Sequence, residues 1–127
     1  MVREAIITPY PPRSHYSRGI KTEQFIFTAG TVGDQNLDTG EKIGGIEAQT
    51  RQALETIKEI LKLGGSSLDN VADTTVYITN RDDFLKMNEV YKTYFLKDPP
   101  TRTTLIVGLR PGVLVEIKCI ACRSYSV

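Results

Sequence analysis

Histidine and cysteine are scarce in this 127-residue chain, which has one histidine, His15, and two cysteines, Cys119 and Cys122. The sequence shows no Ser-His-Asp set for nucleophilic catalysis and no metal-binding cluster. The two cysteines lie three residues apart in a segment expected to be a strand, so their side chains point to opposite faces and cannot bind one ion. We therefore expect two free thiols and no metal site.

Excess charge and long apolar runs are also missing. The net charge is +1, from 16 Lys and Arg residues against 15 Asp and Glu residues. A nucleic-acid partner held through its phosphates needs a concentrated basic face, which this balance does not favour. No apolar stretch is long enough to span a bilayer, and the apolar run near the N-terminus is too short for a signal peptide. We expect a cytoplasmic protein with no membrane partner.

What is present is the composition of one globular domain, which we place at residues 1–127. Hydrophobic residues make up 40% of the chain and charged residues 24%, as in ordinary soluble proteins. A chain of this length buries enough surface on folding to need no disulfide or metal for stability.

The spacing of apolar residues predicts an α+β fold, a mixed β-sheet with two helices packed on one face. The predicted strands cover 4–8, 17–21, 24–29, 71–79, 103–109 and 113–123, and the predicted helices cover 45–63 and a segment capped by Asn80 or Asp82 that ends at Phe95. We expect the last two strands to form a hairpin around 110–112. In the first helix, Gln49 is expected to point away from the apolar stripe.

Two helices leave the second face of the sheet uncovered. We expect Phe25 or Ile26, Ile106 and Ile120 on that face, which is too apolar to remain in water. The pattern therefore predicts an oligomer in which another copy covers the open face.

One pair of residues could carry chemistry. Glu116 interrupts an apolar segment of the last strand, and a carboxylate there is costly unless it is paired or near water. In a tight hairpin, Arg102 would lie opposite Ile120 on the same face as Glu116, about 13 Å away along the strand. Arginine could then bind a substrate carboxylate while the glutamate deprotonates a water molecule. The alternative is an ion pair without catalytic function.

An ordered series of short motifs resembles the reactive-intermediate deaminase family, also called the Rid or YjgF family. The series runs through Thr8-Pro9, Tyr16-Ser17, Thr28-Ala29-Gly30-Thr31, Gln49 to Leu54, Ala72 to Tyr77, Phe84, Asn88 to Tyr91, Pro100-Thr101-Arg102 and Val115 to Ala121. The resemblance implies a chorismate-mutase-like fold, a homotrimer with pockets between subunits, and no cofactor. It implies that Arg102 holds the substrate carboxylate, that Glu116 handles the attacking water, and that Tyr16 comes from the adjoining subunit.

The resemblance also places Gly30, Ala29 and Thr104 in the substrate pocket. Several positions differ from the family's usual residues: Ser14-His15 replaces Gly-Pro, Arg18 replaces Gln, Ala29-Gly30-Thr31 replaces Ser-Gly-Gln, and Thr104 replaces Cys. Arginine and glutamate are kept, so the implied reaction class is kept while the pocket wall changes.

The implied activity is hydrolysis of enamine or imine intermediates, such as 2-aminoacrylate, to 2-oxo acids and ammonia. Two alternatives stay open at this point. One is a non-catalytic binder or regulator that takes small carboxylate metabolites into the intersubunit clefts. The other is an RNA-directed activity, such as translation inhibition or RNA cleavage, which the near-neutral charge and the single histidine do not favour.

Overall fold

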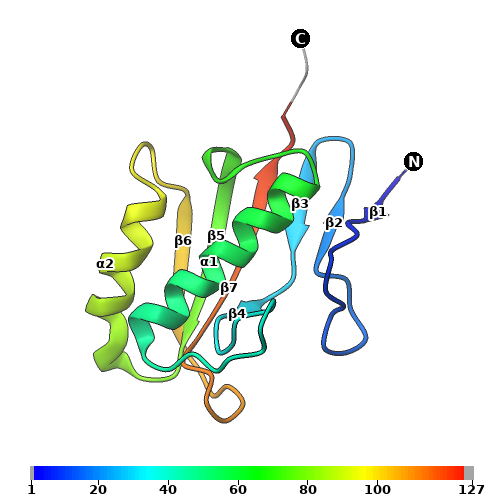
Figure 1. Ribbon diagram of the computed structural model, residues 1–127. Coiled ribbons are helices and arrows are strands. Elements are labelled where there is room, and N and C mark those ends of the chain that lie inside the picture. The colour runs from blue at the N-terminus through cyan, green and yellow to red at the C-terminus, as the bar shows by residue number, and fades with distance from the viewer. Residues whose placement is uncertain (1, 125–127) are drawn as a thin grey trace.

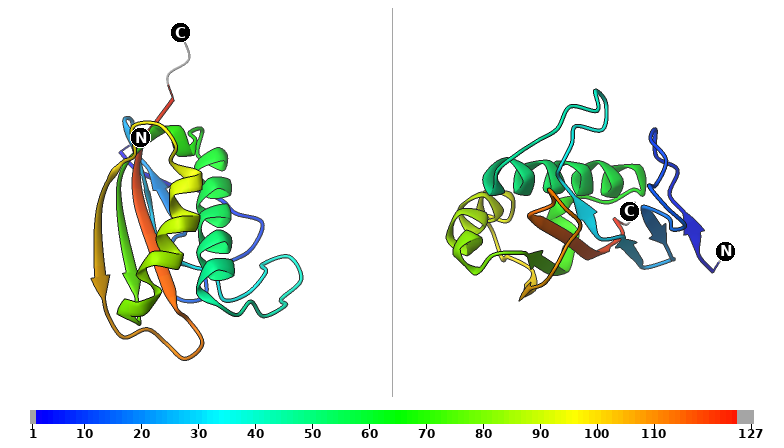
Figure 2. Two further views of the ribbon diagram at one scale, coloured as in Figure 1. Left: turned by 90° about the vertical axis from the view of Figure 1, so that its left-hand side faces the viewer. Right: turned by 90° about the horizontal axis from the view of Figure 1, so that it is seen from below.

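The computed structural model describes residues 2–124 and contains one mixed sheet and two α-helices (Figure 1). The strands are β1 (Glu4–Ala5), β2 (Gly19–Lys21), β3 (Phe25–Thr28), β4 (Thr31–Val32), β5 (Val71–Ile78), β6 (Thr101–Ile106) and β7 (Val115–Cys122). The helices are α1 (Ile46–Leu63) and α2 (Phe84–Tyr94), and short 3-10 turns cover Leu68–Asn70 and Arg81–Asp83. Both α-helices lie on one face of the sheet (Figure 2), which confirms the α+β prediction.

The predicted hairpin of the last two strands is wrong. The strand order is β1-β2-β3-β7-β5-β6, with β4 added beside β7, so β5 lies between β6 and β7. β5 pairs in parallel with β6 and antiparallel with β7, and the connection after β6 crosses the end of β5 (Figure 1). The prediction relied on the local turn sequence at 110–112. Because β5 lies between β7 and β6 and beneath the helices, its alternate residues Thr74, Val76 and Ile78 are at most 1% exposed.

The remaining strands match the prediction in place but are shorter. β1 covers two residues of the predicted 4–8 segment, and β4, also of two residues, was not predicted. Such short pieces carry no clear alternation, so only their pairing with β2 and β7 reveals them.

Helix α1 follows the predicted apolar stripe, ends at Leu63 as predicted, and is followed by the glycine pair Gly64-Gly65. Gly65 follows the C-cap Gly64 and has a φ of 84°, the left-handed backbone conformation with which many α-helices end and which glycine adopts most easily. The predicted cap of the second helix is only partly right. The Asn80 side chain accepts a hydrogen bond from the backbone N–H of Asp82, but it caps the short 3-10 turn Arg81–Asp83. Helix α2 begins after this turn, and its N-cap Asp83 makes no side-chain capping hydrogen bond.

The open face of the sheet carries an apolar patch. Phe25, Phe27 and Leu105 are each about 40% exposed there, and Ile120 pairs with Phe27 on the same face. Ile26 is instead fully buried under the helices. The prediction for Ile106 is also wrong: it pairs with the buried Ile78, so it faces the helix side at the open edge of the sheet.

The two cysteines behave as predicted from strand alternation. Both are free: Cys119 is buried on the helix side and Cys122 is exposed. Burial raises the pKa of the Cys119 thiol to about 11, so this thiol is protonated and unreactive at neutral pH.

Gln49 departs from its predicted solvent-facing position, since only 1% of it is exposed. Its Nε2 donates to the carbonyls of Ile43 at 2.9 Å and Gly112 at 2.8 Å, and its Oε1 accepts from the backbone N–H of Leu114 at 2.9 Å. One amide therefore links two loops to α1 through three hydrogen bonds to backbone groups.

We predict that Gln49→Leu destabilises the fold by about 2 to 5 kcal/mol, because it leaves three backbone groups without partners at similar side-chain volume. Urea unfolding monitored by circular dichroism measures the change. Gln52→Leu is the matched control, since Gln52 bonds only the Thr56 hydroxyl among the described contacts, and it should cost less than about 1 kcal/mol. Equal losses from the two variants would contradict the role given to Gln49.

Candidate active site

A cavity of about 410 Å³ opens beside β4 and β7 and contains four of the predicted site residues. Its lining comprises Arg13, Tyr16, Arg18, Ala29, Gly30, Thr31, Val32, Leu37, Arg110 and Glu116. Tyr16 comes from the loop before β2, Ala29 and Gly30 from the link between β3 and β4, and Glu116 from β7. The structure thus brings Tyr16, Ala29, Gly30 and Glu116 together in one chain.

Glycine at position 30 is what lets Glu116 take its place. A Cβ on Gly30 would overlap the Glu116 carboxylate and lie 2.8 Å from its Cδ. Glu116 is held opposite Val32 by the β4–β7 pairing, so the carboxylate packs directly over the Gly30 backbone. A side chain at position 30 would push this carboxylate out of its position.

The Glu116 carboxylate is half-buried, and among residues 2–124 no Lys, Arg or His nitrogen lies within 4.0 Å of it. Its neighbours on the same strand, Val115 and Ile117, are fully buried on the helix side. A carboxylate placed in a cavity without a cationic partner can accept a proton from a water molecule, which is the task of a general base.

Arg102 lies in a different place, on the edge strand β6 beside α2. Its Nη1 donates to Asn88 Oδ1 at 2.8 Å, and its Cζ lies 4.7 Å from the centre of the Tyr91 ring and 5.6 Å from that of Phe84. Cation–π contacts of this kind contribute about 0.5 to 2 kcal/mol each and restrict the guanidinium to one orientation. Thr104, two residues along, shares this side of β6.

The predicted shared face of Arg102 and Glu116 is wrong. Arg102 pairs with Thr74 of β5, whereas Glu116 pairs with Tyr77 of β5. Thr74 and Tyr77 are three residues apart and therefore point to opposite faces. With β5 between them, the two backbones are roughly 14 Å apart, from two strand spacings and three residues of offset. Within one chain, a small molecule cannot contact both side chains, and the simple ion pair is also absent from the described contacts.

The sequence analysis does not predict the surroundings of Arg102. Phe84, Met87, Tyr91 and Phe95 have the spacing of an apolar core stripe on α2, and Met87, Tyr91 and Phe95 are buried. Phe84, Asn88 and Tyr91 have the i, i+4, i+7 spacing of one helix face, and this face meets Arg102. The polar Asn88 within that stripe was the available signal.

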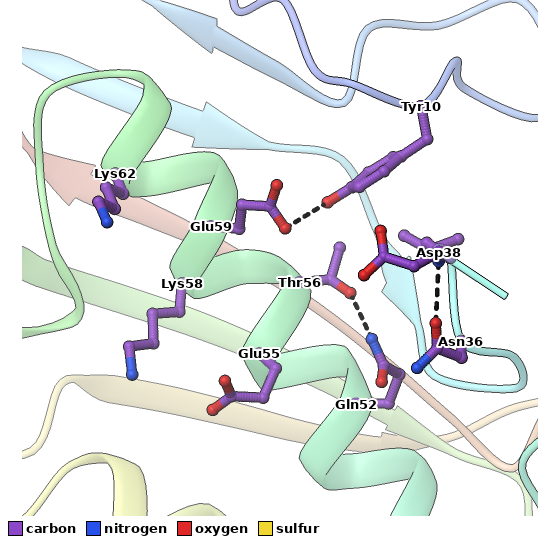
Figure 3. A pocket seen from close by; sticks show the side chains of 10 residues that line it. Tyr10, Asn36, Asp38, Gln52, Glu55, Thr56, Lys58, Glu59 and Lys62 are labelled. Atoms are coloured by element: carbon purple, nitrogen blue, oxygen red, sulfur yellow. Dashed lines mark hydrogen bonds between the residues drawn. The ribbon is translucent and has the colours of Figure 1, made fainter.

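A second cavity, of about 420 Å³, lies between α1 and the 36–38 loop and contains none of the predicted residues (Figure 3). Tyr10 donates a hydrogen bond to Glu59 at 3.1 Å at its upper edge. Burial, followed by the nearby Glu59 charge, raises the pKa of Tyr10 to about 12, so its hydroxyl stays protonated and serves as a donor. Charges of both signs line this cavity, which gives it no clear chemical preference.

Across residues 2–124, no group of three or more His, Cys, Asp or Glu side chains is arranged to hold a metal ion. Neither of the two α-helices in this part of the chain has the length and apolarity to cross a membrane.

Comparison with known proteins identifies the family. The family model described as Endoribonuclease L-PSP matches residues 7–123. A RutC family protein of Pyrococcus abyssi is 42% identical over 127 residues, covering 97% of this chain and 99% of that protein. The 2-iminobutanoate/2-iminopropanoate deaminase of Mus musculus is 36% identical over 127 residues, covering 97% of this chain and 93% of the mouse protein.

Among solved structures, that of Escherichia coli TdcF with bound serine superposes with a TM-score of 0.84 at 32% identity, covering 98% of this chain and 99% of TdcF. The α+β sheet and the full-length match define the class. The chain belongs to the L-PSP family, which is the YjgF/RidA family that the sequence resembles.

We predict that Gly30→Ala displaces the Glu116 carboxylate while the fold persists, because the overlap falls on the mobile end of a side chain. A crystal structure of the variant should show a changed Glu116 rotamer, and its melting temperature should fall by no more than about 5 °C. Gly44→Ala is the control, since a Cβ there meets nothing within 4 Å. An unmoved Glu116 beside a shifted Gly30 backbone would contradict this account.

Proposed function

We propose that this protein hydrolyses enamine or imine intermediates that carry a carboxylate, releasing a 2-oxo acid and ammonia without a cofactor. The observation that carries the proposal is the Glu116 carboxylate, which faces a cavity over Gly30 and has no cationic partner among the described residues. Its relation to the mouse protein, whose name states 2-iminobutanoate/2-iminopropanoate deaminase, supports the same reaction class.

Hydrolysis of an imine requires only that the protein position the substrate and a water molecule and supply one general base. An enamine first tautomerises to the imine, whose nitrogen is protonated as the iminium. Glu116 accepts a proton from water as the water oxygen bonds to the iminium carbon, giving a carbinolamine. Glu116 then returns this proton to the nitrogen, and the C–N bond breaks as the hydroxyl proton passes to the Glu116 carboxylate, which releases ammonia and leaves the 2-oxo acid. Holding water and imine together accounts for much of such a rate enhancement.

Substrate anchoring in this proposal requires a second copy of the chain. Arg102 is the residue suited to bind the substrate carboxylate bidentately, yet it lies on the opposite face from Glu116 in its own chain. We propose that the edge strand β6 of one copy meets the Glu116 cavity of the next, with Arg102 and Thr104 supplied by one copy. Tyr16, Ala29, Gly30 and Glu116 are then supplied by the other. This differs from the sequence-based expectation, in which Tyr16 alone came from the adjoining subunit.

The apolar open face supports a closed assembly of this kind, and we propose a homotrimer. Phe25, Phe27 and Leu105 would be covered there, which removes exposed apolar surface from water. Light scattering should give three times the chain mass of 14.2 kDa, and a stable monomer at micromolar concentration would contradict the shared site.

The alternative functions differ from this proposal in what they predict for turnover. A non-catalytic binder would retain small carboxylates without releasing ammonia from an imine. An RNA-directed activity would cleave or bind RNA and be insensitive to Glu116→Gln. Ammonia release from imines generated by an amino-acid oxidase, measured with and without the protein, separates the proposed hydrolysis from both alternatives, and an RNA-cleavage assay then separates these two from each other.

We predict that Arg102 and Glu116 variants lose activity in different ways. Glu116→Gln should lower kcat roughly a hundredfold, the usual contribution of one general base, with little change in KM. Arg102→Lys keeps the charge but loses the bidentate contact, worth about 1.5 to 3 kcal/mol. It should therefore lower kcat/KM roughly ten- to a hundredfold, partly through a raised KM.

Kinetics and thermal melts on both variants test this prediction. Glu47→Gln and Arg81→Lys are matched controls at exposed positions outside the site, and both should retain full activity. Equal losses of melting temperature for the two site variants, with unchanged turnover per folded molecule, would give both residues a purely structural role.

A further inference from the structure

We propose that the Glu116 cavity binds a second carboxylate on the substrate side chain through Arg13, Arg18 and Arg110. The preferred substrates are then imines derived from dicarboxylic amino acids. This inference rests on the proposed function and specifies its substrate class.

The cavity contains more positive than negative charge. Three of its lining residues are arginines and one is a glutamate. Arg13 and Arg110 share a single carboxylate, Asp34, at 3.0 Å and 3.2 Å. Asp34 and Glu116 together leave one of the three guanidinium charges unbalanced, while the chain as a whole is close to neutral. A cavity with an excess of positive charge attracts anionic ligands.

Of the three arginines that line the cavity, Arg18 is the one that forms no ion pair with a carboxylate of the described residues. It is 91% buried, since 9% of it is exposed, and no Asp or Glu oxygen of residues 2–124 lies within 4.0 Å of its charged nitrogens. Its Nη2 donates to the carbonyl of Pro11 at 2.9 Å, its Cζ lies 4.8 Å from the centre of the Tyr10 ring, and its Nε has no hydrogen-bond partner in the described structure.

Burying the Arg18 guanidinium in this way is unfavourable in free energy unless a ligand supplies a hydrogen-bond acceptor. A guanidinium has five N–H donors, and burying it with few partners costs free energy that structural arginines normally recover by bonding to carbonyls and carboxylates. A carboxylate is the acceptor whose geometry fits the guanidinium best. A ligand carboxylate at this wall would satisfy Arg18 and balance the excess charge.

The position of Arg18 relative to Glu116 suits a ligand with two carboxylates. The Arg18 carbonyl accepts a hydrogen bond from the N–H of Ala29 at 3.0 Å, and the next residue, Gly30, contacts the Glu116 carboxylate. Arg18, Arg13 and Arg110, which together form an arginine wall, therefore line the same cavity as Glu116, the proposed general base. The carboxylate attached to the imine carbon is left to Arg102 of the adjoining copy, and the side-chain carboxylate to Arg18 with Arg13 and Arg110.

The test compares two imines that differ in the second carboxylate. D-Amino-acid oxidase acting on D-alanine gives 2-iminopropanoate, and D-aspartate oxidase acting on D-glutamate gives 2-iminoglutarate. Both imines are planar at the reacting carbon, so the chirality of the parent amino acid does not matter. Semicarbazide traps the imines, and the loss of semicarbazone formation on adding the protein gives kcat/KM for each imine.

We expect the wild-type protein to have a higher kcat/KM for 2-iminoglutarate than for 2-iminopropanoate. Arg18→Gln should lower the ratio of these values, 2-iminoglutarate over 2-iminopropanoate, roughly ten- to a hundredfold, as for loss of a charge-assisted contact. Glutamine is the residue common in the family at this position. Because Arg18 is buried, Arg110→Gln, at a side chain that is 49% exposed, provides a second variant that should fold and lower the same ratio. Arg51→Gln, at an exposed position on α1, should leave the ratio unchanged.

Two outcomes would overturn the inference. Equal activity on both imines, or a ratio that neither Arg18→Gln nor Arg110→Gln changes, would show that the arginines do not select the substrate, while the proposed function would stand. Inactivity of the wild-type protein on both imines would instead contradict the proposed function, and the inference with it.

Discussion

The position of β5 between β6 and β7 is the constraint on which the arrangement of the site depends. β5 is hydrogen-bonded along both edges, in parallel to β6 and antiparallel to β7. This places Arg102 and Glu116 on different strands and on opposite faces, although they are close in the sequence. A chain that keeps both residues for one substrate must bring them together from different copies. The open apolar face and the exposed edge at β6 provide surfaces for that association.

Each half of the proposed site is ordered by its own neighbours. Arg102 is held by Asn88 and by the rings of Tyr91 and Phe84, all from α2. Glu116 is held by its strand and by the absence of a side chain at Gly30. Both halves are thus preorganised before a copy or a substrate arrives, which lowers the ordering cost of assembling the site.

Much of this could be predicted from the sequence, and the failures have one cause. The two helices, the long strands and the opposed cysteines follow from local periodicity. The order of strands in the sheet depends on which pairing buries the most surface, and local pattern does not contain it. The hairpin was predicted from a turn, and the shared face of Arg102 and Glu116 failed with it. Gln49 failed similarly, because a buried glutamine with all its hydrogen bonds satisfied has the same local signature as an exposed one.

The family resemblance grouped Tyr16, Gly30 and Glu116, which strand geometry alone could not do, and these three residues line one cavity of the structure. It did not identify the arginine wall, since Arg18 departs from the family's usual residue and Arg13 and Arg110 lie in loops. Their convergence on one cavity is a property of the folded chain.

The central claim is that one active site is assembled from two copies, and mixed oligomers test it most directly. Glu116→Gln chains and Arg102→Ala chains, each nearly inactive alone, are unfolded together in equal amounts and refolded. If Glu116 and Arg102 come from different copies, about a quarter of the sites in a random mixture contain both native residues, and activity should recover to that fraction of wild type. Activity no higher than the mean of the two separate variants would contradict the account.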